Sequence, residues 1–268
     1  MSDRYAVVGN PVAHSKSPEI HALFARQTGQ DIEYTRLLAP VDGFRETVMR
    51  FAGGGGCGMN VTVPFKFEAF ELSSQLTLRA KMAGAVNTLR FEGEAIYGDN
   101  TDGAGLVADI TRNAGISLSN SRILLLGAGG AAYGVMLPLL EQKPEFIHVA
   151  NRDESKAREL AKRFAEYGKI AASSYEGLKD RFDVVINATS AGLQNAMPPV
   201  PSAVFRQDTL ALDMVYADKP TSFMAFASQQ GAKVRDGFGM LVEQAAESFF
   251  VWRGVLPDTK AVFAFFGR

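Results

Sequence analysis

Two short segments of the sequence carry side chains that could move a proton. In NVTVPFK (60–66), an apolar, strand-like run ends at Lys66, and Pro64 closes the run because proline cannot donate to a sheet ladder. In YGDNTDG (97–103), Asp99 and Asp102 precede a predicted helix. A lysine and a carboxylate can deliver or remove a proton at a substrate oxygen. Taken singly, Lys66 also fits a solvated loop lysine and Asp102 a helix cap.

A glycine-rich turn points to a nucleotide. LLLGAGGAA (124–132) follows a predicted strand, opens a predicted helix and matches G-x-G-x-x-G/A with Gly127, Gly129 and Ala132. Gly127 allows a tight turn, Gly129 allows the backbone to approach a pyrophosphate, and the helix N-terminus supplies N–H donors. This strand–turn–helix context predicts dinucleotide binding. The alternative is a glycine turn that only packs tightly.

The end of the next predicted strand bears on the choice of dinucleotide. NAD sites place an acid there, at the ribose hydroxyls, whereas NADP sites favour an arginine. The sequence has VANRDESK, with Asn151 and Arg152 at this point and Lys156 one helical turn further. The planar guanidinium suits a phosphate. Asp153 would repel a 2′-phosphate, but the balance of charges favours NADP.

The candidate residues lie on a chain in which predicted strands alternate with predicted helices, and these elements must hold them in place. Strands alternating with helices predict an α/β fold with parallel strands and right-handed crossovers. A helix is expected from Ser17 as N-cap and Pro18 at the first helical position to Gly29, and two helices are expected in 237–267. The expected strands are 5–10, 32–38, 57–66, two around the turn at Glu92–Gly93, then 122–127, 146–152, 169–173, 182–190 and 210–216.

Composition excludes several classes of protein. The 268 residues are 47% hydrophobic and 21% charged, which is ordinary for a globular protein of two domains. A net charge of −1 without a basic run argues against nucleic-acid binding. The single cysteine, Cys57, fits a reducing cytoplasm, and three scattered histidines make a zinc site unlikely, so no metal is expected. The N-terminus shows no signal peptide, and the apolar run 123–140 is broken by glycines, so no membrane span is expected.

Eight motifs together resemble the shikimate dehydrogenase family, in the family's order and over nearly the whole chain. They are GNPVAHSKSP, NVTVPFK, AGAVNTL, GDNTDG, GAGGAA, NATSAG, DMVY and DGFGMLVEQAA. The resemblance implies an oxidoreductase that interconverts 3-dehydroshikimate and shikimate with NADP. This reaction belongs to the shikimate pathway of chorismate and aromatic amino-acid biosynthesis. It further implies a cytoplasmic monomer or homodimer whose partner is a small-molecule substrate.

The resemblance also implies an architecture and a set of site residues. Residues 1–101 with 239–268 would form a substrate-binding domain, and 102–238 a Rossmann-like NADP-binding domain, with a cleft between them. Lys66 and Asp102 would be the catalytic pair. The implied substrate contacts are Ser15, Ser17, Thr62, Asn87, Tyr216 and Gln244. The implied cofactor contacts are Gly127, Ala128, Gly129, Gly130, Ala131, Asn151, Arg152, Asp153, Lys156, Met214 and Gly237.

Two positions depart from the family pattern. The family usually has threonine where this chain has Asp153 and often arginine where it has Tyr133, and both lie at the adenosine-phosphate end. A quinate/shikimate dehydrogenase with relaxed NAD/NADP use is therefore one alternative. A non-catalytic NADP-sensing module is another, but it would need neither Lys66 nor Asp102. A metabolite-binding scaffold without a cofactor would leave the glycine turn unexplained.

Overall fold

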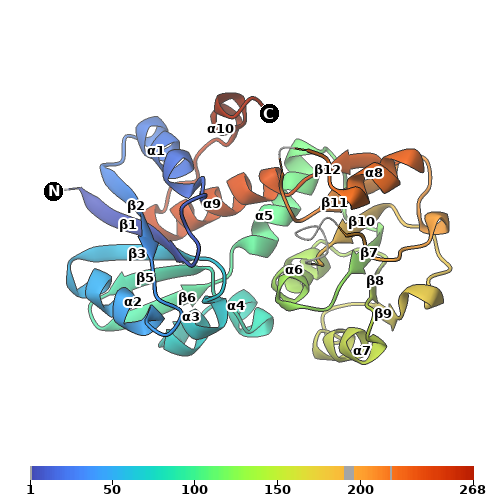
Figure 1. Cartoon of the computed structure of the whole chain (residues 1–268), viewed down its shortest axis with the longest axis horizontal. Helices are drawn as coiled ribbons and strands as arrows, with labels where there is room; N and C mark the ends of the chain where they lie inside the picture. The colour runs from blue at the N-terminus through green and yellow to red at the C-terminus, as the bar shows by residue number, and fades with distance from the viewer. Residues whose placement is uncertain (1, 190–195, 218) are drawn as a thin grey trace. The chain divides into compact units, whose positions relative to one another are not determined.

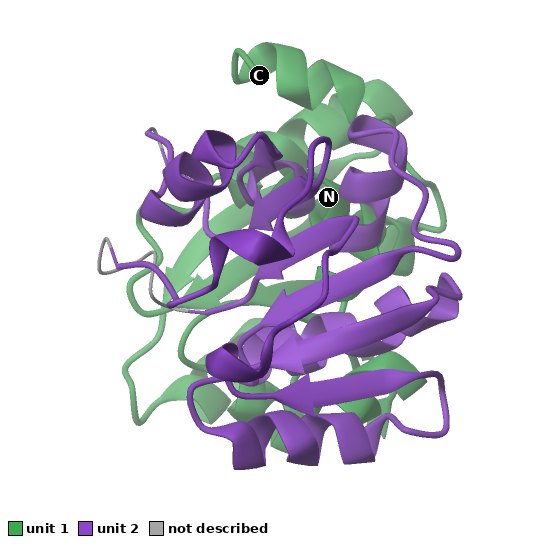
Figure 2. Ribbon diagram, turned by 90° about the vertical axis from the view of Figure 1, so that its right-hand side faces the viewer, with its two compact units in different colours: residues 1–105, 241–268 green, residues 106–240 purple. Residues whose placement is uncertain are grey.

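The computed structural model describes residues 2–189, 196–217 and 219–268, which fall into two compact units. Unit 1 comprises the chain up to Gly105 together with Leu241–Arg268, and unit 2 comprises Leu106–Met240 (Figure 2). Each unit has its own six-stranded sheet and its own helices (Figure 1). The predicted α/β class is therefore confirmed.

Unit 1 is built on a mixed sheet in the order β2-β1-β3-β5-β6-β4. Strand β1 is parallel to β2 and β3, whereas β5 is antiparallel to β3 and β6. The elements are β1 (Asp3–Gly9), α1 (Ser17–Thr28), β2 (Ile32–Leu38), α2 (Phe44–Gly53), β3 (Gly56–Val61), α3 (Lys66–Leu72), β4 (Gln75–Leu76), α4 (Leu78–Ala83), β5 (Thr88–Glu92) and β6 (Ala95–Asp99). They are joined by most of α9 (Phe238–Arg253) and by α10 (Lys260–Phe265).

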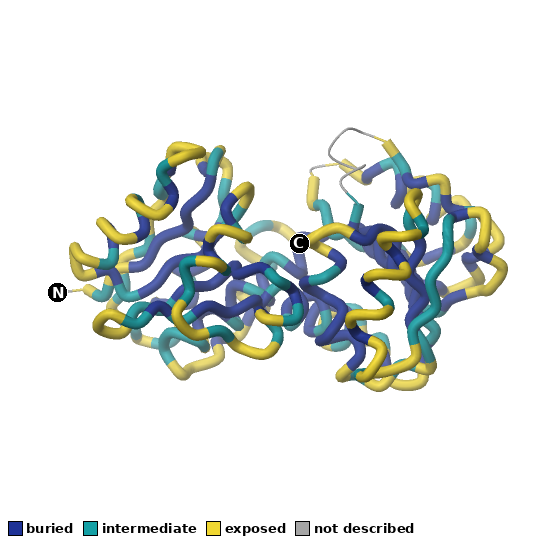
Figure 3. The backbone as a smooth tube through the Cα atoms, turned by 90° about the horizontal axis from the view of Figure 1, so that it is seen from below, coloured by how far each residue is buried: buried dark blue, intermediate teal, exposed yellow. Residues whose placement is uncertain are grey.

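Both faces of this sheet are covered by apolar side chains. On one face, Ala6 and Val8 of β1 pack in a cluster with Phe44 of α2 and with Phe65, whose rings stack 4.9 Å apart. On the other face, Tyr5 stacks on Trp252 of α9 at 4.7 Å. Successive residues of a strand point to opposite faces, so the apolar run of β1 serves both layers. The central strands β1 and β3 are mostly buried, whereas the edge strand β2 contains no buried residue. Figure 3 shows how buried and exposed segments of the backbone are distributed.

Unit 2 carries an entirely parallel sheet in the order β12-β11-β10-β7-β8-β9. The chain runs outward from β7 to one edge, returns to β10 and runs to the other edge, which is the doubly wound order of Rossmann-like folds. The elements are α5 (Asp102–Ala108, which begins in unit 1), a π-helix (Asp109–Asn113), β7 (Arg122–Leu126), α6 (Gly130–Glu141), β8 (Phe146–Ala150), α7 (Glu154–Arg163), β9 (Ile170–Ser173), β10 (Val184–Asn187), β11 (Leu210–Asp213), α8 (Ser222–Gln229) and β12 (Lys233–Arg235).

The sequence missed several elements and one helix start. Helix α8 and strands β4 and β12 were not predicted, and the helix expected after Thr101 continues as a π-helix from Asp109. Ser17 is the first residue of α1 and not its N-cap; Lys16 occupies the N-cap position, and no side chain caps this helix. Within the predicted strand 182–190 and the NATSAG motif, residues from 190 on lie outside the described part of the chain.

In the part of the chain that the structure describes, no helix has the length and apolarity that crossing a bilayer requires.

An ion-pair cluster ties three elements of unit 1 together. Arg79 of α4 donates to both oxygens of Asp99, at the end of β6, over 2.7 and 2.6 Å, and to Glu247 of α9 over 2.9 Å. Thr77 Oγ1 also donates to Asp99, over 2.6 Å. Burial opposes ionisation, but the hydrogen bonds and charge of Arg79 outweigh it and lower the pKa of Asp99 below its ordinary value.

We predict that Asp99→Asn destabilises the protein at neutral pH by roughly 3 kcal/mol, since a nearly buried pair is broken. A carboxyl with a lowered pKa in the folded state stabilises above its unfolded pKa of about 3.9 and loses this contribution as the pH falls through the folded pKa. The gap in melting temperature between parent and variant should therefore close in acid.

The matched control is Glu92→Gln, because the Arg90–Glu92 pair is exposed and surface pairs contribute little. Melting temperatures measured across a pH series decide the matter. A gap between parent and Asp99→Asn that is independent of pH would contradict the prediction.

Candidate active site

Lys66 is held at the start of α3 by the turn that ends β3. Phe65 is fully buried, and its N–H donates to Thr62 O over 3.1 Å, while Ala69 N–H donates back to Phe65 O over 2.8 Å. The buried Phe65 ring therefore anchors the turn, and the side chain of the next residue, Lys66, lies outside the core and is partly exposed. This local arrangement explains why a lysine follows an apolar strand.

Asp102 is the partner of Lys66. Lys66 Nζ lies 2.5 Å from Asp102 Oδ2, and the two side chains are 32% and 17% exposed. Asp102 begins α5, and its N–H donates to the side chain of the buried Asn100 over 3.2 Å. The two candidate proton carriers are therefore in direct contact and only partly shielded from solvent.

The order of the strands explains this contact. Strand β5 lies between β3 and β6 and is antiparallel to both, so its beginning lies beside their ends. Asn60 pairs with Thr88, and Thr88 pairs with Asp99. The segments after β3 and β6 and before β5 thus meet at one edge of the sheet. These segments carry Lys66, Asp102 and Asn87.

Two of the predicted substrate contacts join this pair. Asn87 Nδ2 lies 2.8 Å from Asp102 Oδ1 and 3.3 Å from Gln244 Oε1. Gln244 approaches closely because Gly105 has no side chain: a Cβ at that position would lie 2.6 Å from the Gln244 backbone nitrogen. Lys66, Asp102, Asn87 and Gln244 therefore form one polar cluster.

Ser15 and Ser17 form a second pair of hydroxyls. Their Oγ atoms lie 3.1 Å apart, and Ser17 is buried. Arg36 of β2 donates from Nε and Nη2 to the carbonyl oxygen of Ser15 over 3.0 and 2.6 Å, and it also pairs with Glu19 over 2.7 Å. The Arg36–Glu19 pair thus fixes the backbone of the serine turn, and the two hydroxyls lie beside one another as hydrogen-bond donors for an acceptor group.

The remaining predicted substrate contacts are less connected. Thr62 bonds through its backbone N–H to Val8 O over 3.0 Å, and its methyl group occupies the space that a side chain at Gly9 would need. Tyr216 belongs to unit 2, where its ring contacts Phe238 edge-on at 6.5 Å and burial raises the pKa of its hydroxyl. The structure therefore groups the predicted substrate contacts in unit 1, with Tyr216 as the exception.

The glycine turn of unit 2 has the geometry of a phosphate site. Gly127 adopts φ +103°, and a Cβ there would lie 3.2 Å from Ala188 O, so glycine is required at this position. No side chain caps the N-terminus of α6, and Gly129, Gly130 and Ala131 are exposed. The free N–H groups and the helix dipole favour an anion. Because the turn follows β7 beside β10, it lies where the strand order reverses.

The segment after β8 contains the predicted phosphate contacts. Arg152, Asp153 and Lys156 are all exposed. Burial raises the pKa of Tyr175, and the nearby charge of Arg152 opposes this rise. Asp153 is the N-cap of α7: its Oδ1 accepts from Ser155 N–H over 3.0 Å and from Ser155 Oγ over 2.6 Å. These bonds lower the pKa of Asp153.

Met214 and Gly237 lie in contact. A Cβ at Gly237 would be 2.2 Å from Met214 O, and Gly237 N–H donates to Val215 O over 3.1 Å. The segment is fixed by the fully buried Asp213, which accepts from Thr221 Oγ1 over 2.7 Å and from Val215 N–H over 3.1 Å. Burial raises the pKa of Asp213. The structure thus joins the two predicted nicotinamide contacts through a close backbone packing.

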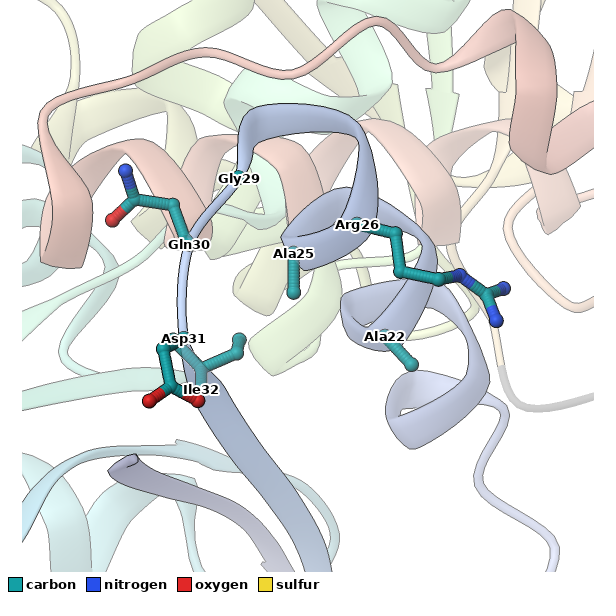
Figure 4. A pocket seen from close by; sticks show the side chains of 7 residues that line it. All are labelled: Ala22, Ala25, Arg26, Gly29, Gln30, Asp31 and Ile32. Atoms are coloured by element: carbon teal, nitrogen blue, oxygen red, sulfur yellow. The ribbon is translucent and has the colours of Figure 1, made fainter. Parts of the chain in front are cut away.

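A hollow of about 410 Å³ lies elsewhere in unit 1. It is lined by residues at the end of α1, in the following turn and at the start of β2, and by none of the candidate site residues (Figure 4). The lining residues are Ala22, Ala25, Arg26, Gly29, Gln30, Asp31 and Ile32. The side chain of Arg26 extends away from Asp31, so the polar groups do not converge on one ligand (Figure 4). The hollow is therefore a weaker candidate for a ligand site than the Lys66 cluster.

The sequence missed the polar side chains behind the cluster: Asn60, Thr88, Thr101 and Ser248, all of which are buried. The four-residue spacing of Gln244 and Ser248 on α9 was the one available signal, since it places both on one helix face. Among the described residues, no group of three or more His, Cys, Asp or Glu side chains could hold a metal ion.

Three family models match the chain. A shikimate dehydrogenase substrate-binding domain matches residues 7–89, a shikimate/quinate 5-dehydrogenase domain matches 109–196, and a shikimate 5′-dehydrogenase C-terminal domain matches 237–262. The matches cover both units and the segments that carry most of the candidate site residues.

Known proteins resemble the chain over its whole length. The NADP-dependent shikimate dehydrogenase of Herminiimonas arsenicoxydans is 60% identical, with 98% of this chain and 97% of that protein covered. The crystal structure of an Ael1 enzyme from Pseudomonas putida matches with a TM-score of 0.94 at 46% identity, covering 98% of each chain. Shikimate 5-dehydrogenase from Thermus thermophilus, in complex with NADP(H) and shikimate, matches with a TM-score of 0.85 at 33% identity, covering 96% and 95%.

The capping role of Asp153 can be tested apart from any ligand. We predict that Asp153→Ala lowers the melting temperature, because α7 loses the acceptor for its first N–H groups, whereas Asp153→Asn keeps it near the parent value. Thermal unfolding of the three proteins provides the measurement. Equal losses in both variants would show that the carboxylate charge, and not the cap, stabilises this helix.

Proposed function

The chain belongs to the shikimate dehydrogenase family, and we propose that it reversibly reduces 3-dehydroshikimate to shikimate with Lys66 and Asp102 as its proton-transfer pair. It is an NADP-dependent oxidoreductase: its relatives' names give the cofactor, and its family models give the dehydrogenase activity. The observation that carries the residue assignment is the 2.5 Å contact between Lys66 Nζ and Asp102 Oδ2 beside Asn87.

Reduction of the ketone needs a hydride at the carbonyl carbon and a proton at its oxygen. Bound NADPH supplies the hydride, and the protein must supply the proton. Both oxygens of Asp102 already accept hydrogen bonds, one from Lys66 and one from Asn87. Lys66 Nζ carries three hydrogens and so keeps donors for a substrate oxygen. This arrangement supports Lys66 as the group that polarises and protonates the carbonyl, and Asp102 as the group that orients Lys66.

The polar lining of unit 1 suits a polyhydroxylated acid. The paired hydroxyls of Ser15 and Ser17, braced by Arg36, would bind the carboxylate, while Thr62, Asn87 and Gln244 would bind ring hydroxyls. Tyr216 would add a hydroxyl from unit 2. Buried polar groups reject a ligand that leaves them unpaired, so such a lining discriminates by hydroxyl pattern.

Unit 2 would hold NADP. Gly127, Ala128, Gly129, Gly130 and Ala131 would receive the pyrophosphate at the start of α6, while Met214 and Gly237 would contact the nicotinamide. Arg152 and Lys156 would meet the 2′-phosphate, with Asn151 beside the ribose. Asp153 uses one oxygen on Ser155, so its charge is partly engaged within α7 and opposes the phosphate less than an unengaged carboxylate would.

The catalytic contact also weighs against a non-catalytic NADP sensor, because such a module would have no need of a lysine held against an aspartate. The choice between shikimate and quinate is an outcome of the assay below. We place the enzyme in the cytoplasm, where its single cysteine would stay reduced, as a monomer or homodimer.

We predict that Lys66→Ala lowers kcat by roughly 10² to 10⁴ while the KM for shikimate changes little, because a general acid–base group is lost. Asp102→Asn should lower kcat similarly and alter its pH profile, because the amide keeps the size but loses the charge. NADPH formation from shikimate, followed by absorbance, measures both effects.

Lys260→Ala is the matched control, since this lysine begins α10 away from the polar cluster. The control should keep parental kinetics. A Lys66→Ala enzyme with more than about half of the parental kcat would exclude the proposed role. If the parent turned over quinate faster than shikimate, quinate would replace shikimate as the assigned substrate.

A separate prediction concerns the cofactor. Arg152→Ala should raise the KM for NADP much more than the KM for NAD, because only NADP carries the 2′-phosphate. Asp153→Asn should lower the KM for NADP and leave that for shikimate alone, because the cap stays and a negative charge leaves.

Arg158→Ala, which removes an exposed arginine further along α7, is the matched control and should change neither KM. If Arg152→Ala raises the KM for NADP and NAD equally, no 2′-phosphate contact runs through Arg152. An unchanged KM for NADP in Asp153→Asn would show that its charge is already neutralised by its helix.

A further inference from the structure

The hydroxyl of Ser248 lies at the centre of a buried polar network in unit 1. Ser248 is fully buried on α9, and its Oγ lies 2.9 Å from Asn60 Nδ2, 2.8 Å from Thr88 Oγ1 and 3.1 Å from Thr101 Oγ1. It also lies 3.0 Å from the carbonyl oxygen of Gln244, one turn earlier. One hydroxyl therefore connects three segments of chain that are far apart in the sequence.

The two ends of this network fix its direction. Thr101 N–H can only donate and lies 2.9 Å from Asn87 Oδ1, so that oxygen faces Thr101 and Asn87 Nδ2 faces Asp102. At the other end, the backbone carbonyl of Asn87 can only accept and lies 3.3 Å from Asn60 Nδ2. The Asn60 oxygen consequently accepts from the Tyr34 hydroxyl over 2.7 Å. Both amide orientations are thus determined.

Ser248 completes the chain between these ends. Asn60 Nδ2 donates to its oxygen, and its own hydroxyl is placed to donate to the Gln244 carbonyl. Between Ser248 and the hydroxyls of Thr88 and Thr101, either oxygen can be the donor. Thr101 Oγ1 accepts the second hydrogen of Asn87 Nδ2 over 2.9 Å. The first hydrogen goes to Asp102 Oδ1. Every donor in the chain has an acceptor, as a stable buried network requires.

We propose that Ser248 is a positioning residue for the reaction: it holds the Thr101 hydroxyl in place, and this hydroxyl supports the Asn87 amide that holds the Asp102 carboxylate beside Lys66. The inference rests on the proposed function of this pair. Among the described contacts, Ser248 touches neither Lys66 nor Asp102, so its effect on turnover passes through Thr101 and Asn87. Small misplacements of a catalytic group have large effects on rate.

The test is the steady-state kinetics of Ser248→Ala. We expect kcat to fall about tenfold, the loss of one well-made hydrogen bond, and the pH profile of kcat to shift because Asp102 is less firmly held. The KM for NADP should stay at the parental value, since the cofactor contacts lie in unit 2. A merely structural serine would lower the melting temperature and leave kcat, KM and the pH profile of the folded enzyme unchanged.

Two variants sharpen the comparison. Ser73→Ala makes the same chemical change at a serine that donates only to the carbonyl one turn earlier, Ala69 O over 2.7 Å, and should keep the parental kcat and pH profile. Ser248→Thr keeps the hydroxyl and should recover most of the kcat. Should Ser248→Ala not fold, Ser248→Cys replaces the hydroxyl with a weak hydrogen-bonding thiol of similar size, and the same criteria apply.

The outcomes separate this inference from the proposed function. If the parent oxidises shikimate and folded Ser248→Ala or Ser248→Cys shows the parental kcat and pH profile, the positioning role is wrong and the function stands. If the parent turns over no shikimate with either cofactor, the proposed function itself is wrong, and this inference falls with it.

Discussion

The contact between Lys66 and Asp102 is the constraint around which unit 1 is arranged. The two residues are 36 positions apart, and they meet because β3 and β6 run in the same direction and end at one sheet edge. The antiparallel β5 between them begins at that edge and brings Asn87 beside the pair. The parallel sheet of unit 2 achieves a comparable result differently, because all its strands end at one edge and gather the segments after β7, β8 and β11 there.

In both units, different residues therefore provide stability and carry the candidate site: the strands do the first, and the turns that follow them do the second. The central strands β1 and β3 of unit 1 and β7, β8, β10 and β11 of unit 2 are mostly apolar and buried, and their packing stabilises the fold. The polar groups stand where strands end, in turns whose backbone is anchored by one buried side chain. Phe65 serves this purpose beside Lys66, and Asp213 serves it beside Met214. A turn anchored in this way holds a side chain more firmly than a free loop does, which positioning for catalysis requires.

The sequence predicted the α/β class and the glycine turn, because both depend on local pattern, and its motifs predicted a Lys66–Asp102 pair, whose side chains the structure brings into contact. It did not predict the network around Ser248, because Asn60, Thr88, Thr101 and Ser248 meet only after folding and no spacing marks their partnership. Asp153 shows a subtler limit. The sequence shows that a negative charge stands beside Arg152. The hydrogen bonds of Asp153 to Ser155, however, depend on where α7 begins, and helix ends are the least certain part of a sequence-based prediction.

A buried polar network is an unusual way to fill a core. What it contributes is a defined orientation of hydrogen-bonding groups rather than additional stability. Apolar residues of similar volume can be as stabilising, since desolvation offsets most of the gain from buried hydrogen bonds. Apolar groups, however, form no hydrogen bonds and so do not determine which way the oxygen and nitrogen of an amide point. Here the Thr101 N–H and the Asn87 carbonyl have fixed polarity: the first orients the Asn87 amide toward Asp102, and the second orients the Asn60 amide. The core behind Lys66 and Asp102 therefore sets the orientation of these hydrogen bonds as well as its shape.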